Sequence, residues 1–344
     1  MKQWKNYGYK RNKESKINQK LTDLSIIIVN FRGWTRLSQC LDSLANIDDS
    51  RFSFEVVIVD NNSNDGLIDL FQERFPTFLF VKNSGNNGFS NGCNLGVKYT
   101  IGDCLLFLNP DTVITADAIF VLLDEIRRRK LFSIVSCRQV REDGSHERPY
   151  GHFPTPLTLT GWLRGLGKIG LWKPLKNVSE TDDFIYPEWV SGSVIMILRD
   201  SLNALAGWDE DYWMYFEDVD LCKRAGMLGG EIVLIKRCCV EHNHGGSSRI
   251  NRKVTALTKS EVNISRHVYI SKHEVGFKAS MMHLFLVINN LLFGFIPALI
   301  GLSLFFVNGL FATANSYFRL TGYYTRRLTS PTWLSHRSIN YPKI

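Results

Sequence analysis

The stretch Cys104-Leu-Leu-Phe-Leu-Asn-Pro-Asp-Thr112 decides the fold, because a run of apolar residues ends abruptly on polar ones. Leu105–Leu108 is short and wholly apolar, which predicts a strand buried on both faces of a sheet. Pro110 cannot donate a hydrogen bond to a neighbouring strand, so the strand must end before it. In open α/β sheets, ligands bind beyond the carboxyl ends of the strands. Asn109 and Asp111 are therefore candidates for a binding site, although Asn-Pro-Asp also suits an ordinary turn.

Segments typical of strands and helices alternate along most of the chain. Apolar, β-branched runs predict strands, and apolar residues at helical spacing predict helices. The expected strands cover residues 26–29, 54–59, 79–82, 105–108, 134–137, 190–198 and 232–239, and the expected helices cover 37–44, 68–75, a segment ending at 99, 119–128 and 219–225. This alternation predicts an α/β domain with a doubly wound, mostly parallel sheet. Residues 141–187 lack periodicity, which is typical of a lid or a binding loop.

Polar motifs follow the first strands, at the positions where a ligand would bind. Asn30 and Phe31 follow the first strand, and Asp60 follows the second. Asp60 also suits a helix cap. Between Asn86 and Gly96, a segment rich in glycine and asparagine offers backbone N–H groups and a helix N-terminus, which together suit phosphate groups.

Two further clusters carry ionisable side chains. Glu217, Asp218 and Asp220 lie within four residues, and we expect such acids to raise one another's pKa, which suits a general base. The same three acids also suit the N-terminus of a solvated helix. His242 and His244 follow the last expected strand.

In their order and spacing, the motifs at 25–31, 56–63, 86–96, 104–112 and 207–222 resemble those of the family 2 nucleotide-sugar glycosyltransferases, which are inverting enzymes with the GT-A fold. The resemblance is greatest to the rhamnosyltransferases of O-antigen and polysaccharide synthesis, and it covers roughly residues 24–248. It implies transfer of a sugar from a nucleotide-diphospho-sugar to a lipid-linked saccharide. Rhamnose from dTDP-rhamnose is the first expectation. UDP-dependent transfer of galactose, galactofuranose or an N-acetylhexosamine is the alternative.

The resemblance also implies a role for each candidate residue. Asp218 is expected to be the catalytic base, with Glu217 as the alternative. The residues expected to bind the donor are Asn30, Phe31, Asp60, Asn87, Gly88, Asn94, Asn109 and Asp111. The residues expected to contact the acceptor are Ser191, Gly192, Trp208, Asp209 and Glu210.

The resemblance further implies a divalent cation as cofactor. The family's metal motif is usually Asp-x-Asp, but Asn109 stands here in place of the first carboxylate. Asp111, with His242 or His244, is therefore expected to hold Mg²⁺ or Mn²⁺. Mg²⁺ often uses few protein ligands, and Mn²⁺ accepts imidazole more readily. The missing carboxylate leaves a metal-independent variant as the alternative.

Both ends of the chain are basic, and a long apolar segment precedes the basic C-terminal end. The formal net charge is +8, and residues 1–20 hold seven Lys and Arg against one Glu. No acid, Lys or Arg occurs between Lys278 and Arg319. The apolar segment at 284–314 is interrupted by Pro297, which predicts a helical hairpin lying in or re-entering a membrane surface. A hairpin buried in the protein core is the alternative.

These features divide the chain into four expected parts. They are a basic N-terminal arm at 1–22, a GT-A domain at 23–275 with halves meeting at 112/113, a C-terminal apolar helical segment at 276–320 and a basic tail at 321–344. The seven cysteines lack C-x-x-C spacing, and no signal-peptide pattern occurs, which favours a reducing compartment. We therefore expect the cytoplasmic face of the inner membrane. The expected partners are a nucleotide-sugar, a polyprenyl-diphosphate-linked saccharide and the membrane surface, with no nucleic acid.

Two other classes of protein fit the sequence less well. Nucleotidyltransferases that make nucleotide sugars need a glycine-rich loop with Arg or Lys directly after the first strand, and Asn30-Phe-Arg-Gly-Trp34 is not one. A non-catalytic scaffold or nucleic-acid binder would account for the basic ends. It would not explain why acids collect at three strand ends.

Overall fold

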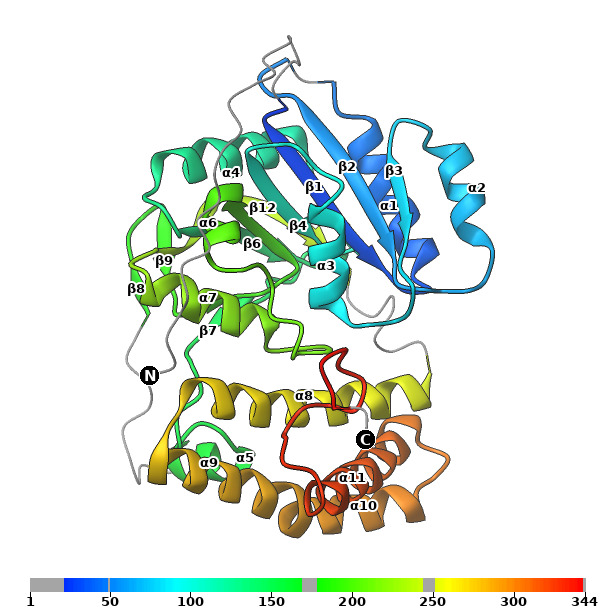
Figure 1. Cartoon of the computed structure of the whole chain (residues 1–344), viewed down its shortest axis with the longest axis vertical. Helices are drawn as coiled ribbons and strands as arrows, with labels where there is room; N and C mark the ends of the chain where they lie inside the picture. Colours follow the sequence, from blue (N-terminus) through cyan, green and yellow to red (C-terminus); the bar gives the residue numbers. More distant parts are fainter. Residues whose placement is uncertain (1–21, 49, 169–177, 244–250, 343–344) are drawn as a thin grey trace.

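The computed structural model describes residues 22–48, 50–168, 178–243 and 251–342. A large mixed sheet has helices on both faces, and a separate layer of helices lies below it in Figure 1. The strands are β1 (Leu24–Asn30), β2 (Phe54–Asp60), β3 (Leu79–Lys82), β4 (Cys104–Leu108), β5 (Thr112–Val113), β6 (Ile134–Val140), β7 (Tyr150–Gly151), β8 (Ser179–Glu180), β9 (Phe184–Tyr186), β10 (Trp189–Val190), β11 (Val194–Leu198) and β12 (Ile232–His242). The helices around the sheet are α1 (Trp34–Ala45), α2 (Leu67–Arg74), α3 (Phe89–Val97), α4 (Ala116–Arg128), α5 (Gly161–Lys168), α6 (Arg199–Ala204) and α7 (Glu217–Met227).

The sheet runs in the order β3-β2-β1-β4-β11-β6-β12-β9-β8. Strands β3, β2, β1 and β4 are parallel, and β12 is parallel to β6, whereas β11 lies antiparallel between β4 and β6. The predicted doubly wound, mostly parallel sheet is therefore confirmed. The predicted strand at 190–198 is interrupted: β10 pairs with β7 in a small separate sheet, and only β11 joins the main one.

Two apolar cores hold the helices against the sheet. Successive residues of a strand point to opposite faces, so Ile26 and Ile28 of β1 belong to one core and Ile27 and Val29 to the other. Helices α1, α2 and α4 cover the first face, and α3, α6 and α7 cover the second. Because both faces are covered, β1 and β4 are buried along their whole length, as their apolar sequences predict.

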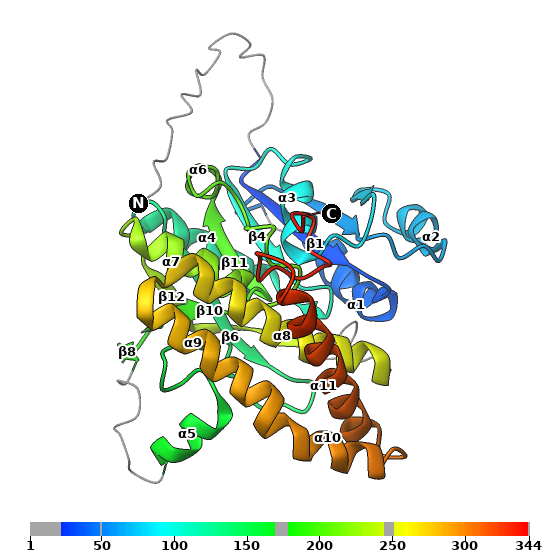
Figure 2. The same ribbon diagram turned by 60° about the horizontal axis from the view of Figure 1, so that its bottom comes forward.

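The remaining helices are α8 (Arg252–His273), α9 (Gly276–Ile288), a π-helical turn η1 (Asn289–Phe293), α10 (Gly294–Ser303) and α11 (Asn308–Arg327). We call α8 to α11 the helical layer. In the turned view of Figure 2, α11 runs beside α10 and α8. A C-terminal helical hairpin is present, with α10 and α11 as its arms, and its first arm belongs to the apolar helix at 276–303.

The turn of this hairpin lies at residues 304–307, so the prediction that the chain breaks at Pro297 was wrong. Helix α10 continues through Pro297, and the π-helical turn η1 directly precedes it. A proline removes one backbone N–H and crowds the preceding turn. The π-helical turn is a second local departure from the α-helical hydrogen-bond pattern, and the helix continues through both.

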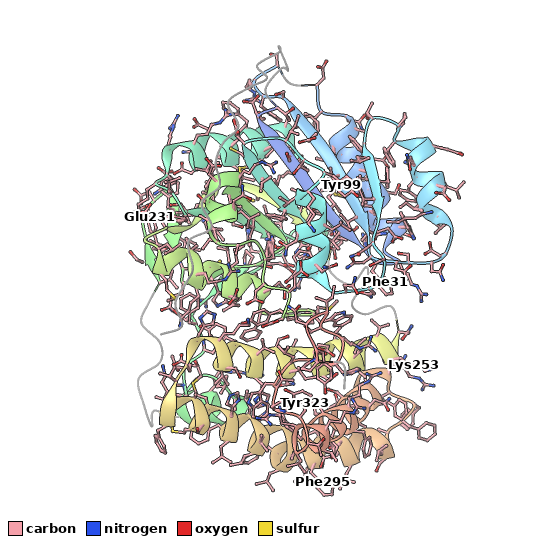
Figure 3. The ribbon with its side chains drawn as sticks, viewed as in Figure 1. Phe31, Tyr99, Glu231, Lys253, Phe295 and Tyr323 are labelled. Atoms are coloured by element: carbon pink, nitrogen blue, oxygen red, sulfur yellow. The ribbon has the colours of Figure 1, made fainter. Side chains whose placement is uncertain are left out.

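The helical layer exposes many apolar side chains on the side turned away from the sheet. Phe295, labelled in Figure 3, is 49% exposed there, whereas Tyr323 is buried inside the layer. In the described part of the chain, the continuous helix at 276–303 is the one segment long and apolar enough to cross a membrane. Phe305 and Phe306, in the turn after it, are 61% and 70% exposed.

Candidate active site

The carboxyl ends of the central strands bring most of the predicted site residues to one edge of the sheet. Asn30 and Asp60 are directly opposite each other in the parallel pairing of β1 with β2. The backbone N–H of Asn109, just past β4, donates to the carbonyl of Ser193 at 2.9 Å. Because β11 is antiparallel to β4, its first residues lie at the same edge. The topology therefore places donor and acceptor candidates side by side.

The predicted nucleotide-binding residues Asn30 and Asp60 are buried and organise the loops around them. The Asp60 carboxylate accepts hydrogen bonds from the backbone N–H and the hydroxyl of Ser63. Burial raises the pKa of Asp60, and these hydrogen bonds oppose the rise. Asn30 Oδ1 accepts from the N–H of Gly33 at 3.1 Å, while its Nδ2 is buried with no partner among the described residues. A buried amide without an acceptor is costly, and a bound base or ribose would supply one. Phe31 is half-buried beside them.

The glycine- and asparagine-rich segment meets the loop before α7 at very close range. Gly88 has φ +95°, and a Cβ there would lie 2.2 Å from the carbonyl oxygen of Trp213. Only glycine fits this position. The N–H of Phe89 donates to that same carbonyl at 3.0 Å. Asn87 is held weakly, by a 3.4 Å contact with Asn83.

Asn94 and Glu210 form a structural tie between α3 and the loop before α7. The Asn94 amide donates to Glu210 Oε1 and to the carbonyl of Trp208, both at 2.8 Å, and its oxygen accepts from the N–H of Trp208. Asn91 donates to the other Glu210 oxygen at 2.8 Å. Asp209 is bound instead to Lys272 of α8, at 2.6 Å. Asn94, Asp209 and Glu210 were predicted to contact the donor or the acceptor. In this structure they bind other residues of the same chain.

Trp208 lies in the core, although it was predicted to contact the acceptor. It is 1% exposed, and its ring meets the rings of Phe89 and Phe107 edge-on at 5.5 and 5.0 Å. A ring packed in this way offers no face to a sugar. Trp189 is half-buried and lines the cavity described below, so its ring could stack on a ligand there.

The predicted metal ligands Asp111 and His242 come together, because β5 after Asp111 pairs with the end of β12. Asp111 Oδ1 lies 3.3 Å from His242 Nε2, and Asn109 Nδ2 lies 3.5 Å from the same nitrogen. His242 Nδ1 lies 2.9 Å from Gln139 Oε1. Gln139 donates its amide to a serine hydroxyl at 2.7 Å, so its oxygen is the acceptor and Nδ1 carries the proton.

This tautomer turns the Nε2 lone pair towards the Asp111 carboxylate. Two electron-pair donors facing each other at 3.3 Å fit a cation or a proton between them. Among the described residues, no group of three or more Asp, Glu, His or Cys side chains could hold a metal ion. Asp111 and His242 could therefore hold a divalent cation only together with phosphate oxygens or water. His244, the other predicted ligand, lies outside the described residues.

The acidic cluster at the start of α7 separates into three different environments. Asp218 Oδ2 accepts from the N–H of Gly192 at 2.9 Å, and Oδ1 accepts from the N–H of Val219 at 2.8 Å. Burial raises the pKa of Asp218, and the two N–H donors oppose that rise. Glu217 points into the protein, and burial followed by the Asp218 charge raises its pKa well above the usual value. Glu217 Oε2 has no partner among the described residues, which suits a neutral, protonated acid.

Asp220 behaves in the opposite way, so the prediction that all three acids raise one another's pKa was wrong for it. Burial acts to raise the pKa of Asp220, but a hydrogen bond from His273 and the charge of Arg224 outweigh it and lower the pKa. The Asp220 oxygens lie 2.7 Å from His273 Nε2 and 2.6 Å from Arg224 Nε. Asp220 thus anchors α8 to α7.

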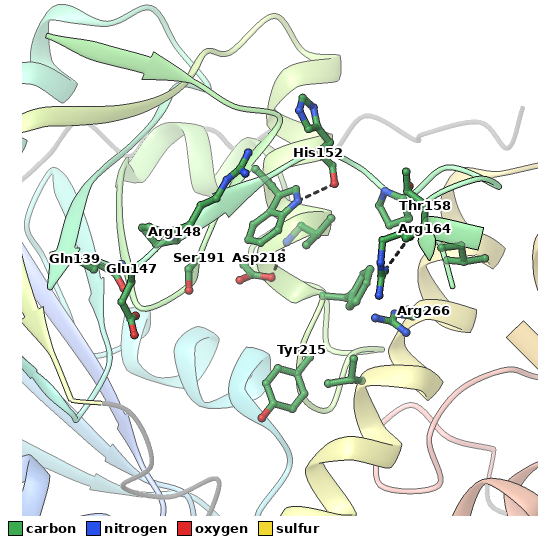
Figure 4. Close-up of a pocket in the computed structure, with 17 residues that line it drawn as sticks. Gln139, Glu147, Arg148, His152, Thr158, Arg164, Ser191, Tyr215, Asp218 and Arg266 are labelled. Carbon is green, nitrogen blue, oxygen red and sulfur yellow. Dashed lines mark hydrogen bonds between the residues drawn. The ribbon is translucent and has the colours of Figure 1, made fainter. Parts of the chain in front are cut away.

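A cavity of about 500 Å³ opens over Asp218, between the sheet and the helical layer. Figure 4 shows Gln139 and Glu147 at one end, Ser191 and Asp218 in the middle, and Arg164 and Arg266 at the other end. Gly192, beside Ser191, binds the Asp218 carboxylate through its N–H. Asp218 therefore has space in front of it for an acceptor, and Glu217 is not among the residues that line this space.

Sequence reasoning missed the residues that line the rest of this cavity. Gln139 lies on β6, Arg148 and Arg164 belong to the segment predicted only to be irregular, and Arg266 belongs to the unpredicted helix α8. The available signal was limited to the concentration of Gly, Pro and Trp in residues 141–187, which indicated a binding loop without identifying its contacts.

The sequence of this chain is similar to a known protein family and to several known proteins. The model of "Glycosyl transferase family 2" matches residues 25–192. The "N-acetylglucosaminyl-diphospho-decaprenol L-rhamnosyltransferase" of Mycobacterium tuberculosis is 25% identical over 249 residues, which are 66% of this chain and 78% of that protein. The "Rhamnosyltransferase WbbL" of Escherichia coli is 25% identical over 213 residues, 59% of this chain and 77% of that protein.

A third relative and a solved structure extend this comparison. The "Low-salt glycan biosynthesis hexosyltransferase Agl10" of Haloferax volcanii is 28% identical over 214 residues; the match spans 60% of this chain and only 62% of that protein. A crystal structure of GalNAc-T7 with UDP, GalNAc and Mn²⁺ superposes with a TM-score of 0.51 at 16% identity, over 74% of this chain and 51% of that chain. The structural likeness confirms the predicted GT-A fold. Residues 25–192 therefore form a glycosyltransferase family 2 domain.

Proposed function

We propose that this protein is an inverting hexosyltransferase that moves a sugar from a nucleotide-diphospho-sugar to a lipid-linked saccharide. The observation that carries the proposal is the Asp218 carboxylate, which two backbone N–H groups hold at 2.9 and 2.8 Å in the wall of a 500 Å³ cavity. Each carboxylate oxygen has a second lone pair, so the carboxylate can accept a proton while its hydrogen bonds stay in place. This is the geometry that a general base requires.

The donor and the acceptor would bind at two different positions along this edge of the sheet. The donor nucleotide would bind beside Asn30, Asp60 and the Gly88 loop. There it would accept a hydrogen bond from the Asn30 amide, which has no partner among the described residues. The acceptor hydroxyl would enter the cavity beside Ser191 and give its proton to Asp218 as it attacks the anomeric carbon. Attack from the side opposite to the leaving diphosphate inverts the configuration at that carbon. Because Glu217 would be neutral, it would place no second negative charge beside the Asp218 carboxylate.

A divalent cation, Mg²⁺ or Mn²⁺, would bind at Asp111 and His242 and would supply positive charge to the leaving diphosphate. The facing lone pairs of the two side chains support this assignment. Imidazole in the ligand set favours Mn²⁺ over Mg²⁺. The contribution of this chain is to hold both ligands rigidly: Gln139 fixes the His242 ring, and the Asp111 backbone carbonyl accepts from the N–H of Asn243 at 2.8 Å.

The best candidate for the transferred sugar is rhamnose from dTDP-rhamnose. Two relatives that match more than three quarters of their own length carry rhamnosyltransferase names. One of these names also specifies a sugar on diphospho-decaprenol, which favours a polyprenyl-diphosphate-linked acceptor in cell-surface polysaccharide or O-antigen synthesis. UDP-galactose, UDP-galactofuranose and UDP-N-acetylhexosamines are the alternative donors.

The helical layer would hold the enzyme on the cytoplasmic face of the inner membrane. The continuous helix at 276–303 is long and apolar enough to cross a membrane, and most of its apolar part is not buried inside the protein. Leu292, Ile296 and Phe306 are at least 65% exposed, so a large apolar surface faces outward. Such a surface is typical of a membrane contact. Because α10 and α11 form a hairpin, the chain can enter and leave the lipid on the same side.

A panel of nucleotide sugars tests the proposed donor. The full-length enzyme would be incubated with each donor and with a farnesyl-diphosphate-linked N-acetylglucosamine, with Mn²⁺ or with EDTA, and released nucleoside diphosphate would be measured. We expect turnover with one deoxythymidine or uridine donor, highest with dTDP-rhamnose. If every donor is only hydrolysed at the rate seen without acceptor, the proposed transfer is wrong. NMR of the product anomeric proton would show whether configuration is inverted.

A further inference from the structure

A pair of arginines lies in the cavity on the side of the helical layer. Arg164 comes from α5 and Arg266 from α8, and both line the cavity that contains Asp218. Figure 4 shows the two guanidinium groups close together, with Asp218 on one side and α8 behind them. Two like charges at such close range repel each other, so their position needs an explanation.

Neither guanidinium has a carboxylate partner in the described part of the chain. Arg164 donates from Nη1 to the carbonyl of Thr158 at 2.9 Å. Arg266 donates from Nη1 to Asn263 Oδ1 at 3.1 Å and lies over the ring of Phe216 at 6.0 Å. Each guanidinium has five N–H donors, so most donors of both groups are available to a ligand.

Burial and the neighbouring charge both disfavour the charged form of Arg266. Burial, followed by the charge of Arg164, lowers the pKa of Arg266 to about 10. A protein keeps two unpaired cations together in a partly dry pocket when an anion neutralises them. Arginine pairs suit phosphate groups in particular, because the planar fork of each guanidinium binds two oxygens at once.

We propose that Arg164 and Arg266 bind the diphosphate group of the acceptor, between the Asp218 carboxylate and the helical layer. This inference rests on the proposed transfer to a diphosphate-linked saccharide, and it assigns the binding site of the diphosphate. The order of groups in the cavity then matches the order in such an acceptor. The saccharide lies against Ser191, Trp189 and Asp218, the diphosphate lies at the arginine pair, and the polyprenyl chain leaves towards the exposed apolar surface of α9 and α10.

The site is distinct from that of the donor diphosphate. The predicted donor contacts Asp111 and His242 belong to the end of the cavity where Gln139 and Glu147 lie, since His242 is bound to Gln139. Arg164 and Arg266 lie at the opposite end, on segments that pack against α9: Leu159 and Ile270, near these arginines in the sequence, share an apolar cluster with Met282 and Leu286. The two anion sites are thus separated by the base.

The kinetic test compares two soluble acceptors that carry the same sugar. One is farnesyl-diphosphate-linked N-acetylglucosamine, and the other is an uncharged octyl glycoside of the same sugar. We expect Arg266→Gln and Arg164→Gln to lower kcat/KM for the diphosphate acceptor roughly 10- to 100-fold. Both variants should leave kcat/KM for the octyl glycoside within about threefold of wild type. The matched control is Lys253→Gln, which removes one charge from the exposed start of α8 and should change neither value.

A binding test is independent of the transfer reaction. Inorganic pyrophosphate would be titrated into wild type and both arginine variants by calorimetry, with the donor site first saturated by nucleoside diphosphate and Mn²⁺. We expect binding to wild type and loss of at least tenfold in affinity in each variant. Arg164 is exposed, so Arg164→Gln keeps the test valid if Arg266→Gln fails to fold.

The outcomes separate the two proposals. Pyrophosphate binding that depends on both arginines, with no transfer to any acceptor, would support the anion site while contradicting the proposed function. Transfer that is equally fast to both acceptors and unchanged in both variants would refute the anion site alone. If binding of phosphatidylglycerol vesicles falls in the variants while pyrophosphate binding does not, the pair serves a lipid headgroup and the diphosphate assignment is wrong.

Discussion

Replacing Asp218 by Asn removes the proposed base while changing few atoms. The carboxylate accepts one hydrogen bond on each oxygen, from the N–H groups of Gly192 and Val219. An asparagine has one acceptor and one donor group, so one of those N–H groups loses its partner and faces another donor. We expect a loss of about 1–3 kcal/mol in the free energy of unfolding. This lowers the melting temperature by roughly 2–10 °C, so Asp218→Asn should still be folded at 25 °C.

The expected effect on catalysis is much larger than the effect on stability. Loss of a general base costs about 10²–10⁴ in kcat, because the acceptor hydroxyl must lose its proton to water instead. Donor affinity should stay within a few-fold, since Asp218 contacts the acceptor side of the cavity. Glu217→Gln is the matched control: Gln has the shape of the neutral acid that burial favours at this position, so kcat should stay within about threefold.

The assay measures release of nucleoside diphosphate with saturating acceptor, together with calorimetric donor binding and thermal unfolding of each variant. In wild type, kcat/KM should fall as the pH is lowered through the pKa of Asp218, which lies above its usual value of 3.8 because the carboxyl is buried. A near-normal rate in Asp218→Asn, combined with a hundredfold loss in Glu217→Gln, would refute the reasoning and assign the base to Glu217.

Three further outcomes test other parts of the structure. Asp111→Ala should weaken nucleoside diphosphate binding and abolish its dependence on Mn²⁺; equal binding of wild type in Mn²⁺ and in EDTA, measured by calorimetry, would contradict the metal assignment. Phe306→Ser should weaken binding to anionic liposomes by roughly tenfold, whereas Leu70→Ser, an equally apolar change on α2, should not alter sedimentation with liposomes. Asp220→Asn should cost about 3–5 kcal/mol in urea denaturation, because it leaves Arg224 buried without its partner. Since the folded-state pKa of Asp220 is lowered, this stabilisation is present above pH 3.8 and is lost as the pH falls through the folded-state value.

The sheet was predictable from sequence because its strands are buried on both faces. Runs such as Ile26–Val29 and Leu105–Leu108 have no polar face, and a strand covered by helices on both sides requires none. The ends of these runs were equally informative, since Asn30 and Asp60 are the last residues of β1 and β2, and Asn109 directly follows β4. Local sequence therefore predicted one edge of the sheet as the site.

Helix α8 was not predictable in the same way. Its buried face includes Ala256, Ser260, Glu261 and His267, so apolar residues do not recur at helical spacing. These side chains are buried because the layer packs through polar contacts, such as the hydrogen bond of His267 to Tyr324. A periodicity argument depends on contrast between an apolar and a polar face, and α8 has little. Arg266 was missed with the helix that carries it.

The roles of Asn94 and Glu210 also required tertiary information. Their types and positions suit a nucleotide and a sugar, and nothing in the sequence indicates that they bind each other across 116 residues. The Asn94 amide binds whichever acceptor lies within hydrogen-bonding distance, a ligand or Glu210. That distance is known only from the fold. Conversely, Asp218 lines a cavity and binds only backbone N–H groups, so no side chain among the described residues competes with a ligand for its carboxylate.

The tie between α3 and the loop before α7 determines which segments can be exchanged between related enzymes. Asn91 and Asn94 bind Glu210, and Gly88 closes against Trp213. A chimera joined at residue 112/113 would take the two sides of this tie from different parents. A foreign side chain at 88 would collide with the loop. A foreign residue at 210 would remove the acceptor of the Asn91 amide and one of the two acceptors of the Asn94 amide. Specificity grafts should therefore carry residues 86–97 together with 207–227 as one unit.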